Sequence, residues 1–417
     1  MELKNISYDE YLKFALKSEY MSIYQLPEWG DLKEINGWKK HLLGLYDGKK
    51  LLGVTLLLQK RLPLKLNLFY APRGFLFDLN DKELLNTWTK ELKKYVKKYH
   101  GFLVKVDPNT IYALYDGDKK SKNVINAEVI NNFKEIGYKH YGYTMDFETM
   151  QPRWLCRFKL NKTYEDTLNS FSKSTRKNIL KLESLGVHVR RIDVKEIDSF
   201  VDILKRAGEA KDFIIRPVSY YKKMYELMNK YVYLYIAYID TKEYLNNVIR
   251  EKERIEKELK DLEKEMSKVN VGKKLTEHKE ALERQILKAE EEIKYAKELR
   301  KEDRVDIGAL MSIFMGNEGI TFMSGTIPEY KKFNPKYAYY NEHIKECIRE
   351  GKEYCNFYGI SGNIDPNSKY YSIYEIKKGY NPEIVELVGE FDLIINRFVY
   401  FGYNLALKVY KLLKKLH

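Results

Sequence analysis

Cysteine is scarce in this chain, and its few copies form no recognisable pair. Among 417 residues there are three, Cys156, Cys347 and Cys355, and no two of them form a Cys-x-x-Cys motif. A small, odd number of cysteines argues against a disulfide-stapled secreted scaffold, because such scaffolds use even numbers of cysteines at close spacings. We therefore expect a protein of a reducing compartment.

Long hydrophobic runs and an apolar leader are also missing. No window holds 18 uninterrupted apolar residues, so we expect no membrane-spanning helix. The first residues, Met-Glu-Leu-Lys-Asn-Ile-Ser-Tyr, lack the apolar core of a signal peptide. Both absences predict a cytoplasmic protein.

The familiar motifs of nucleotide, metal and nucleophile chemistry are absent. The chain has no Gly-x-x-x-x-Gly-Lys-Ser/Thr loop, no Gly-x-Gly-x-x-Gly fingerprint and no His-Glu-x-x-His. Its seven histidines are widely separated, which disfavours a zinc site or a histidine base. We expect neither a metal nor a cofactor, and a protein that binds, positions and stabilises charge.

What the sequence does contain is a long helical repeat within residues 241–301. Its apolar residues alternate at spacings of three and four, the rhythm of a coiled coil, with Lys252 in one seam position: Leu245, Val248, Ile255, Leu259, Leu262, Met266 and Val269. Gly272 ends this run. A second run follows at Leu275, His278, Leu282, Ile286, Ala289, Ile293 and Ala296. Two limbs joined by a turn at 269–274 predict an antiparallel coiled-coil arm, each limb about 40 Å long.

His278 makes the second run irregular. The steps from 278 to 282 and from 282 to 286 are both four residues, which predicts a stutter in the seam. Because residues at such periodic positions are usually buried, we expect the imidazole of His278 to pack in the seam and not to bind a ligand.

Positive charge is in excess, and most of it lies outside this arm. The chain has 74 Lys and Arg against 60 Asp and Glu, a net charge of +14, whereas residues 241–301 carry +2. The remaining +12 suggests a polyanionic partner, such as nucleic acid, a nucleotide-linked substrate or an anionic membrane face. Solubility alone is the alternative explanation.

Two parts of the chain share one order of expected elements. In the first, a hairpin of strands at 41–46 and 51–59 leads through a strand at 69–71 to a helix at 81–99 and a strand at 102–106. The second begins with a strand at 154–160, a helix-rich stretch at 163–185, a short strand at 187–191 and helices at 197–210 and 219–230. Strands at 232–239, 306–314 and 320–324 then lead to a helix at 337–350 and a strand at 355–358. The fold class is therefore α+β with a duplicated unit. The arm is inserted between two consecutive strands, where a long excursion is tolerated.

Two segments are rich in basic residues. Residues 153–191 hold ten Lys and Arg against three acidic residues, and their centre combines hydroxyls with the phosphate-contact candidates Lys173, Arg176 and Lys177. A solvated helix face is the alternative there.

In the C-terminal tail, four lysines alternate with apolar residues: Lys408, Lys411, Lys414 and Lys415, with Leu405, Val409, Leu412 and Leu416. We expect an amphipathic helix that packs its apolar face on the body. The positive outer face could then attract an anionic leaflet.

Several segments, taken in order, resemble the Fem family of non-ribosomal peptidyltransferases, which build peptidoglycan cross-bridges. They are residues 376–383 (Ile-Lys-Lys-Gly-Tyr-Asn-Pro-Glu), 386–392, 356–362, 105–108, 172–179 and 216–220. The resemblance covers nearly the whole chain, and the arm makes it similar to the FemA and FemB branch. It implies two acetyltransferase-like (GNAT) domains, at 1–150 plus 393–417 and at 151–240 plus 302–392. The coiled-coil arm at 241–301 is then inserted in the second domain.

The resemblance also implies a reaction in cell wall biogenesis, and hence in cell shape. An amino acid would pass from aminoacyl-tRNA to the side-chain amine of a peptidoglycan stem peptide, on a lipid-linked or UDP-linked muropeptide. No metal or cofactor belongs to that reaction. A peripheral contact with the inner membrane face is compatible with such an acceptor. The arm resembles the helical arm of some tRNA synthetases, which suggests a tRNA contact.

The family's functional residues can be carried over position by position. Lys33 matches a lysine that contacts the diphosphate of the precursor, and Arg216 and Tyr220 match an Arg-Pro-x-x-Tyr pattern that also contacts precursor. Lys377 matches the lysine placed at the reacting carbonyl, and Ile376 stands beside it where the family usually has Phe. A further family tyrosine falls near Met323 here.

The chemistry of such a transfer sets its own demands. The oxygen of the tetrahedral intermediate carries negative charge, which a fixed ammonium such as that of Lys377 could stabilise. The attacking amine, with an ordinary pKa near 10.4, must lose its proton. Asp107 is a candidate base, or a residue that orients the amine, although we favour the interpretation of this Asp-Pro after a strand as a turn. The tRNA itself could remove the proton instead.

Two other classes of function stay open at this point. One is a non-catalytic, coiled-coil RNA-binding or scaffold protein, which predicts a salt-sensitive RNA complex without chemistry. The other is an acyltransferase with a different activated donor such as acyl-CoA, because a fold alone does not select the donor.

Overall fold

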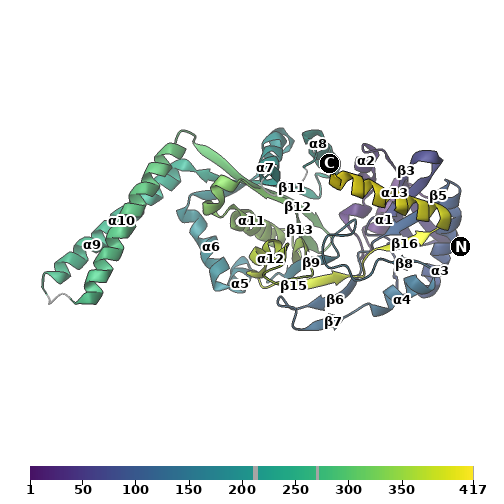
Figure 1. The fold of residues 1–417 in the computed structure, drawn as a ribbon, viewed down its shortest axis with the longest axis horizontal. Helices are drawn as coiled ribbons and strands as arrows, with labels where there is room; N and C mark the ends of the chain where they lie inside the picture. The colour runs from purple at the N-terminus through teal and green to yellow at the C-terminus, as the bar shows by residue number, and fades with distance from the viewer. Residues whose placement is uncertain (210–214, 269–271, 417) are drawn as a thin grey trace.

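The computed structural model describes residues 1–209, 215–268 and 272–416. Within them the chain forms two mixed β-sheets flanked by helices, and a long helical hairpin projects from one end (Figure 1). This mixture of helix and strand agrees with the predicted class. In the described residues no helix is both long enough and apolar enough to cross a membrane.

The first sheet is built mostly from the first 140 residues. Its seven strands, in spatial order, are β1 (Glu2–Asn5), β2 (Trp38–Asp47), β3 (Lys50–Arg61), β4 (Asn67–Ala71), β5 (Gly101–Val106), β16 (Phe391–Ile394) and β8 (Lys139–His140). The helices of this half are α1 (Tyr8–Ala15), α2 (Pro27–Glu34), α3 (Lys82–Lys97) and α4 (Ala127–Glu135), with short turns η1 (Ile23–Gln25) and η2 (Pro63–Lys65).

The second sheet is larger and comes from the later part of the chain. Its nine strands are β10 (Val187–Ile192), β11 (Val232–Asp240), β12 (Arg304–Met315), β13 (Glu318–Thr326), β14 (Tyr354–Ile360), β9 (Trp154–Lys159), β15 (Glu383–Leu387), β6 (Ile111–Tyr115) and β7 (Lys122–Val124). Its helices are α5 (Tyr164–Asn169), α6 (Lys173–Ser184), α7 (Ile197–Glu209), α8 (Val218–Met228), α11 (Pro335–Arg349) and α12 (Tyr371–Lys378), with η3 (Val194–Glu196) and η4 (Pro328–Phe333).

Both sheets contain the same arrangement of consecutive elements. In the first sheet β2, β3 and β4 pair antiparallel, and α3 then crosses to β5, which lies parallel to β4. In the second, β11, β12 and β13 pair antiparallel, and α11 crosses to β14, which lies parallel to β13. The hairpin, helix and strand order expected from the sequence is therefore present twice.

Sheet membership departs from the expected domain limits at one place. Strands β6 and β7 lie in the region assigned to the first domain, but β6 pairs with β15 of the second sheet. The pairing partner of β6, β15, is more than 250 residues away in the chain, so no local pattern could indicate it. The chain thus passes between the two halves more than once.

The two halves also share a hydrophobic core. Side chains of α1, α2 and β3 in the first half pack in one cluster with side chains of α7, α8 and β11–β13 in the second. Trp29 of α2 and Tyr221 of α8 are both buried there. This shared core fixes α2 against α8.

The inserted hairpin consists of α9 (Thr241–Met266) and α10 (Lys273–Leu299). It leaves and rejoins the sheet where β11 and β12 pair, with Asp240 opposite Arg304. The hydroxyl of Thr241 donates to the carbonyl of Glu302, at 2.6 Å, and ties the two ends together. The insertion point is therefore as predicted, whereas Val269 and the rest of 269–271 in the expected turn lie outside the described residues.

The seam between α9 and α10 differs from the expected one at His278. Ile255, Leu262 and Leu282 are buried in the seam, but the His278 side chain is 51 % exposed and lies 3.6 Å from a Glu258 carboxylate oxygen. Lys279, one residue later, is half-buried and pairs with Glu263 of the facing helix at 2.7 Å. With position 279 in the seam the spacing alternates regularly, so both the predicted packing of His278 and the predicted stutter are wrong.

The C-terminal helix α13 (Arg397–Leu416) is longer than expected and is oriented differently. Leu405, Val409 and Leu412, the residues expected to pack on the body, are 54, 48 and 62 % exposed. Val399, Tyr400 and Tyr403 make the contacts with the body instead. The predicted packing of these apolar residues on the body is therefore wrong. Of the lysines expected on the outer face, Lys408 is exposed, whereas the side chains of Lys411, Lys414 and Lys415, like that of Leu416, lie outside the described residues.

Candidate active site

Lys377 is a buried cation beside a cavity. It lies at the end of α12, only 5 % exposed, and its Nζ donates to the carbonyl of Gly359 at 2.9 Å. The cavity measures about 320 Å³, and its walls include Ile376, Met323 and Tyr358 as well as Lys377. An ammonium has three N–H donors, so the bond to Gly359 leaves two for a ligand.

Burial disfavours the protonated, charged form of this lysine. Removal from water lowers the pKa of Lys377 from 10.5 to about 8, the Cys156 thiol opposes this change, and the charge of Lys336 adds to it. Lys377 is still mostly protonated at neutral pH. Its ammonium is thus poorly solvated, the state in which it interacts most strongly with a negative oxygen.

The strand that faces Lys377 is irregular at this point. The pairing of β14 with β9 shifts register between Asn356 and Gly359, and Tyr358 between them has a left-handed φ of 60°. A bulge bends a strand and re-aims its side chains, and such features concentrate at functional sites. Here the bulge presents both the Gly359 carbonyl and the Tyr358 ring to the cavity.

A second lysine, Lys33, lies between the two halves of the protein. Its Nζ lies 4.3 Å from the centre of the Trp29 ring and 3.5 Å from the Tyr220 hydroxyl, to which it donates. Burial and the nearby charge of Arg216 lower the pKa of Lys33 to about 8. Arg216 itself is exposed. The structure therefore brings together the three residues that the sequence resemblance assigned to precursor binding, although nothing in their spacing predicts contact.

A row of aromatic rings leads from Lys33 to the wall of the Lys377 cavity. Trp29, under Lys33, meets Tyr24 with ring centres 4.7 Å apart; Tyr24 meets Phe322 at 6.1 Å, and Phe322 meets Tyr358 at 5.7 Å. The hydroxyls of Tyr24 and Tyr358 also lie 2.6 Å apart. Sequence reasoning assigned no role to these tyrosines or to Phe322. The only available signal was the family-like segment 356–362, which contains Tyr358.

A second cavity, of about 470 Å³, lies on the other side of this row. It is lined by residues 16–19 and 21–24 of the first half and by strands of the second sheet, and Arg73 and Arg157 contribute cations to its wall. Phe322 and Tyr358 line both cavities. The two spaces are therefore separated by aromatic side chains.

Asp107 is held inside a network of the first half. It is 3 % exposed and accepts hydrogen bonds from the backbone N–H of Arg73, at 2.9 Å, and from the Tyr70 hydroxyl, at 3.0 Å. Burial raises the pKa of Asp107 to about 6, and the Arg73 guanidinium opposes that rise. Asp107 is not among the described residues that line either cavity. Its contacts are those of a turn residue, and its role as a base stays a prediction.

The basic helix α6 begins next to the Lys377 segment. The N–H of Ser172 donates to the carbonyl of Gly379 at 2.9 Å, and a Cβ added at Gly379 would lie 2.1 Å from the Thr175 hydroxyl oxygen. Glycine is therefore required for this close approach. Lys173 and Lys177 are exposed on the same helix, and Arg176 is half-buried.

A further hollow lies where α6 meets the hairpin. It measures about 1050 Å³ and has a wall of mixed charge, with Lys181, Arg250 and Lys288 among its cations. The Asn247 side-chain amide of α9 donates to the carbonyl of Glu183 at 3.1 Å across its base. Helix α6 and the hairpin thus form one continuous surface.

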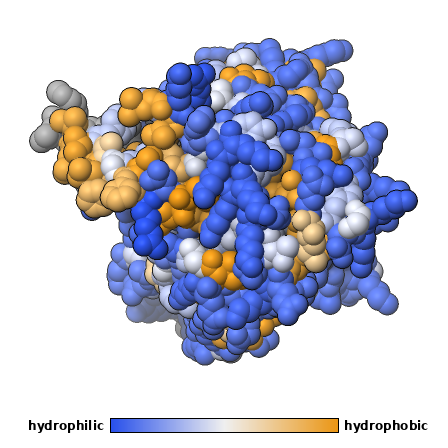
Figure 2. All heavy atoms as spheres, turned by 90° about the vertical axis from the view of Figure 1, so that its right-hand side faces the viewer, coloured by the Kyte–Doolittle hydropathy of each residue, from blue (hydrophilic) through white to orange (hydrophobic). Residues whose placement is uncertain are grey.

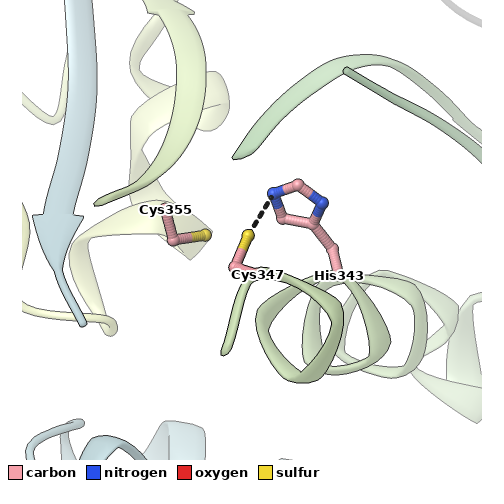
Figure 3. A group of neighbouring side chains, drawn as sticks. All are labelled: His343, Cys347 and Cys355. Atoms are coloured by element: carbon pink, nitrogen blue, oxygen red, sulfur yellow. Dashed lines mark hydrogen bonds between the residues drawn. The ribbon is translucent and has the colours of Figure 1, made fainter. Parts of the chain in front are cut away.

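The described residues contain one cluster of soft donors, in the core of the second half (Figure 3). His343 and Cys347 lie one turn apart on α11, and Cys355 lies on β14, with all three donor atoms within 4.8 Å. The Cys347 Sγ lies 3.4 Å from the His343 Nε2. Burial raises the pKa of the Cys347 thiol, but its contacts with Cys355 and His343 outweigh that effect and lower it overall. Such donors could hold a thiophilic cation, but a structural zinc site uses four ligands, and the described cluster supplies three fully buried ones.

Comparisons with known proteins agree on one family. The model of the FemAB family matches residues 6–408. Aminoacyltransferase FemA of Staphylococcus epidermidis is 29 % identical over 422 residues, covering 100 % of both chains, and FemB of that species is 29 % identical over 96 % of each. The solved structure of FemX, at 25 % identity, matches with a TM-score of 0.75 over 96 % of this chain and 99 % of FemX.

Proposed function

This chain belongs to the FemAB family and is an aminoacyltransferase, and from that premise we propose that it extends peptidoglycan cross-bridges. The donor is aminoacyl-tRNA, and the acceptor is the side-chain amine of the stem peptide on a lipid-linked or UDP-linked muropeptide. The transfer takes place in the cytoplasm. The observation that carries the proposal is the buried ammonium of Lys377 at the wall of a cavity, with two donors left for a ligand.

Lys377 is the proposed catalytic group. As the amine attacks the ester, the carbonyl oxygen becomes negative, and an ammonium already fixed by Gly359 needs no reorganisation to stabilise it. Ile376, in the same wall, offers an apolar surface to the end of the tRNA where a ring would stack. One donor of this kind typically contributes about 2.7–4 kcal/mol to barrier lowering.

Lys33, Arg216 and Tyr220 are the proposed acceptor-binding residues. A phosphate recruits cations and hydroxyl donors, and the two cations here lie close enough for the charge of Arg216 to lower the pKa of Lys33. An anion between them relieves that repulsion. The aromatic row from Trp29 to Tyr358 then leads from the phosphate site to the reacting end of the acceptor.

The tRNA is proposed to lie along α6 and the hairpin. Lys173, Arg176 and Lys177 are near the start of α6, whose first turn contacts the segment that follows Lys377. A tRNA phosphate backbone on these cations brings the acyl end toward the cavity. In the hairpin, ion pairs such as Lys252 with Glu290, at 2.9 Å, join the two helices, and we propose that they form a coiled coil.

The two-domain interpretation is retained as part of this proposal. The repeated order of strands and helix supports two GNAT-like domains. We keep the limits 1–150 plus 393–417 and 151–240 plus 302–392 for them, except that β6 and β7 belong to the second sheet. The arm at 241–301 belongs to the second domain.

The carboxylate of Asp107 already accepts hydrogen bonds from the Arg73 backbone N–H and the Tyr70 hydroxyl. Removal of the amine proton by the tRNA is therefore the favoured route.

The proposal is tested by transfer of a radiolabelled amino acid from charged tRNA to purified muropeptide acceptors. We expect labelled acceptor with at least one pairing of amino acid and stem peptide. Uncharged tRNA with the free amino acid, and acyl-CoA in place of charged tRNA, are the controls. No transfer with any pairing, or transfer from acyl-CoA alone, would contradict the proposal.

A further inference from the structure

Among its described side chains, the C-terminal helix α13 packs on the body through its first two turns. Val399, Tyr400 and Tyr403 pack on a small cluster around Phe102, with the Phe102 and Tyr403 rings 5.3 Å apart. The Tyr400 hydroxyl donates to the Asp392 carboxylate at 3.0 Å. The orientation of the helix about its axis is therefore set, and with it the side that faces solvent.

That outward side carries an apolar strip from Phe398 to Leu412. Large side chains recur there at spacings of three and four and are exposed by 92, 73, 54, 48 and 62 %: Phe398, Phe401, Leu405, Val409 and Leu412. At 100° per residue these positions fall within about a quarter of the helix circumference. Figure 2 shows the resulting ridge of hydrophobic atoms at its upper left, on a face that is otherwise mostly hydrophilic. An apolar ridge of this length on a protein surface indicates an interaction site.

Positive charge accompanies the ridge. After Asp392 the chain has five Lys and Arg and no acidic residue. Arg397 and Lys408 are exposed on the helix itself. The adjoining turn η2 adds Leu64, which is 89 % exposed, between the exposed cations Arg61 and Lys65. Its neighbours Leu62 and Leu66 pack in the same cluster as Val399.

We propose that α13 lies in the headgroup region of an anionic lipid bilayer, with its outward ridge inserted among the acyl chains. A helix of 20 residues with an apolar strip and basic flanks has the composition of an interfacial membrane helix. A second copy of this chain is the less favoured occupant. Two-fold pairing of the same ridge would bring the cations of both copies together without an acidic residue on the helix to offset them.

This inference rests on the proposed function in one respect, because it selects the lipid-linked acceptor over the UDP-linked one. An enzyme held at the bilayer surface by α13 meets a substrate that diffuses in two dimensions in the same surface. The contact with the bilayer itself does not depend on what reaction the enzyme catalyses.

The test is co-sedimentation of the full chain with vesicles, with no transfer reaction involved. Vesicles of phosphatidylcholine are compared with vesicles that also contain phosphatidylglycerol, at low and high salt. The variant carries Phe401→Ser, Leu405→Ser and Leu412→Ser, and the control carries Leu180→Ser and Leu287→Ser, at positions 67 and 62 % exposed on α6 and α10. We expect wild type and control to bind the anionic vesicles, and the α13 variant to bind about tenfold more weakly or worse.

The outcomes are separable. Equal binding of all three proteins, or no binding by wild type, would overturn the proposal. A dimer in sedimentation velocity that the α13 variant alone dissociates would assign the ridge to a second copy. In the transfer assay, the α13 variant should keep wild-type rates on a UDP-linked acceptor and lose rate only on acceptor embedded in vesicles. If neither acceptor is used by wild type while vesicle binding persists, the proposed function fails and the membrane contact stands.

Discussion

Lys33 and Lys377 share one property and differ in every contact. Both have a pKa lowered to about 8, chiefly by burial. Lys377 is enclosed in the second half and held by a backbone carbonyl, whereas Lys33 lies between the halves, against two aromatic rings and near Arg216. The same loss of solvation thus arises in a single cavity in one case and at a junction of two halves in the other.

This difference separates two roles that a buried lysine can have. A cation fixed by one hydrogen bond in a small cavity can act on one atom of a substrate, and its loss should change the rate of the chemical step. A cation that shares its surroundings with a second cation is suited to a phosphate, and its loss should change affinity. Three predictions test this division.

The largest effect is expected for Lys377→Met. Turnover should fall about 100- to 1000-fold, because the negative oxygen loses its donor, while the KM for the muropeptide changes little. Single-turnover transfer assays measure both quantities. Lys378→Met, an exposed neighbour on the same helix, is the matched control and should behave as wild type. Unchanged turnover in Lys377→Met would remove Lys377 from the chemistry.

The next effect concerns stability and pH. Because the pKa of Lys377 is about 8 in the folded state and near 10.5 when unfolded, the unfolded chain binds the extra proton between these values. The free energy of unfolding of wild type should therefore rise with pH in that window, relative to Lys377→Met, by about 3 kcal/mol. Urea unfolding of both proteins across this range measures the difference. A difference that does not vary with pH would show that the pKa of Lys377 is the same in the folded and unfolded states, and hence that this lysine is well solvated in the folded protein.

The smallest effect is expected for Lys33→Met. The KM for the acceptor should rise about tenfold with little change in turnover, because one charge-assisted contact with a phosphate is lost. Arg216→Met should act in the same direction, and Lys13→Met, an exposed lysine of α1, is the control. A fall in turnover as large as that of Lys377→Met would abolish the distinction between the two lysines.

Local patterns in the sequence predicted most of the regular elements. The hairpin of β2 and β3, the helix α3 and both limbs of the arm follow from alternation or helical spacing, since neighbours in the chain determine them. The error at His278 has the same origin: leucine and isoleucine mark a seam clearly, but a lysine in the seam, Lys279, cannot be recognised from residue type.

The candidate site was predicted only through a family resemblance. No sequence repeat relates the site residues to one another, which are at positions 33, 216, 220 and 377. The rings of Tyr24, Phe322 and Tyr358 likewise come from three distant segments. Their contacts arise because α2 packs on α8 and because β14 bulges at Tyr358. Packing between distant segments is a property of the folded chain that no local period reports.

The sequence by itself determined the periodic elements, the excess of positive charge and the amphipathic character of the tail, because each depends on residues that are close along the chain. The tertiary structure decided which side of α13 faces outward, and that β6 joins the second sheet. It also decided that an aromatic row runs from Lys33 to Tyr358, which lines the same cavity as Lys377, 344 positions away from Lys33 in the chain. Periodicity fixes how a helix is divided into faces, but only the surface that it packs against decides which face is buried.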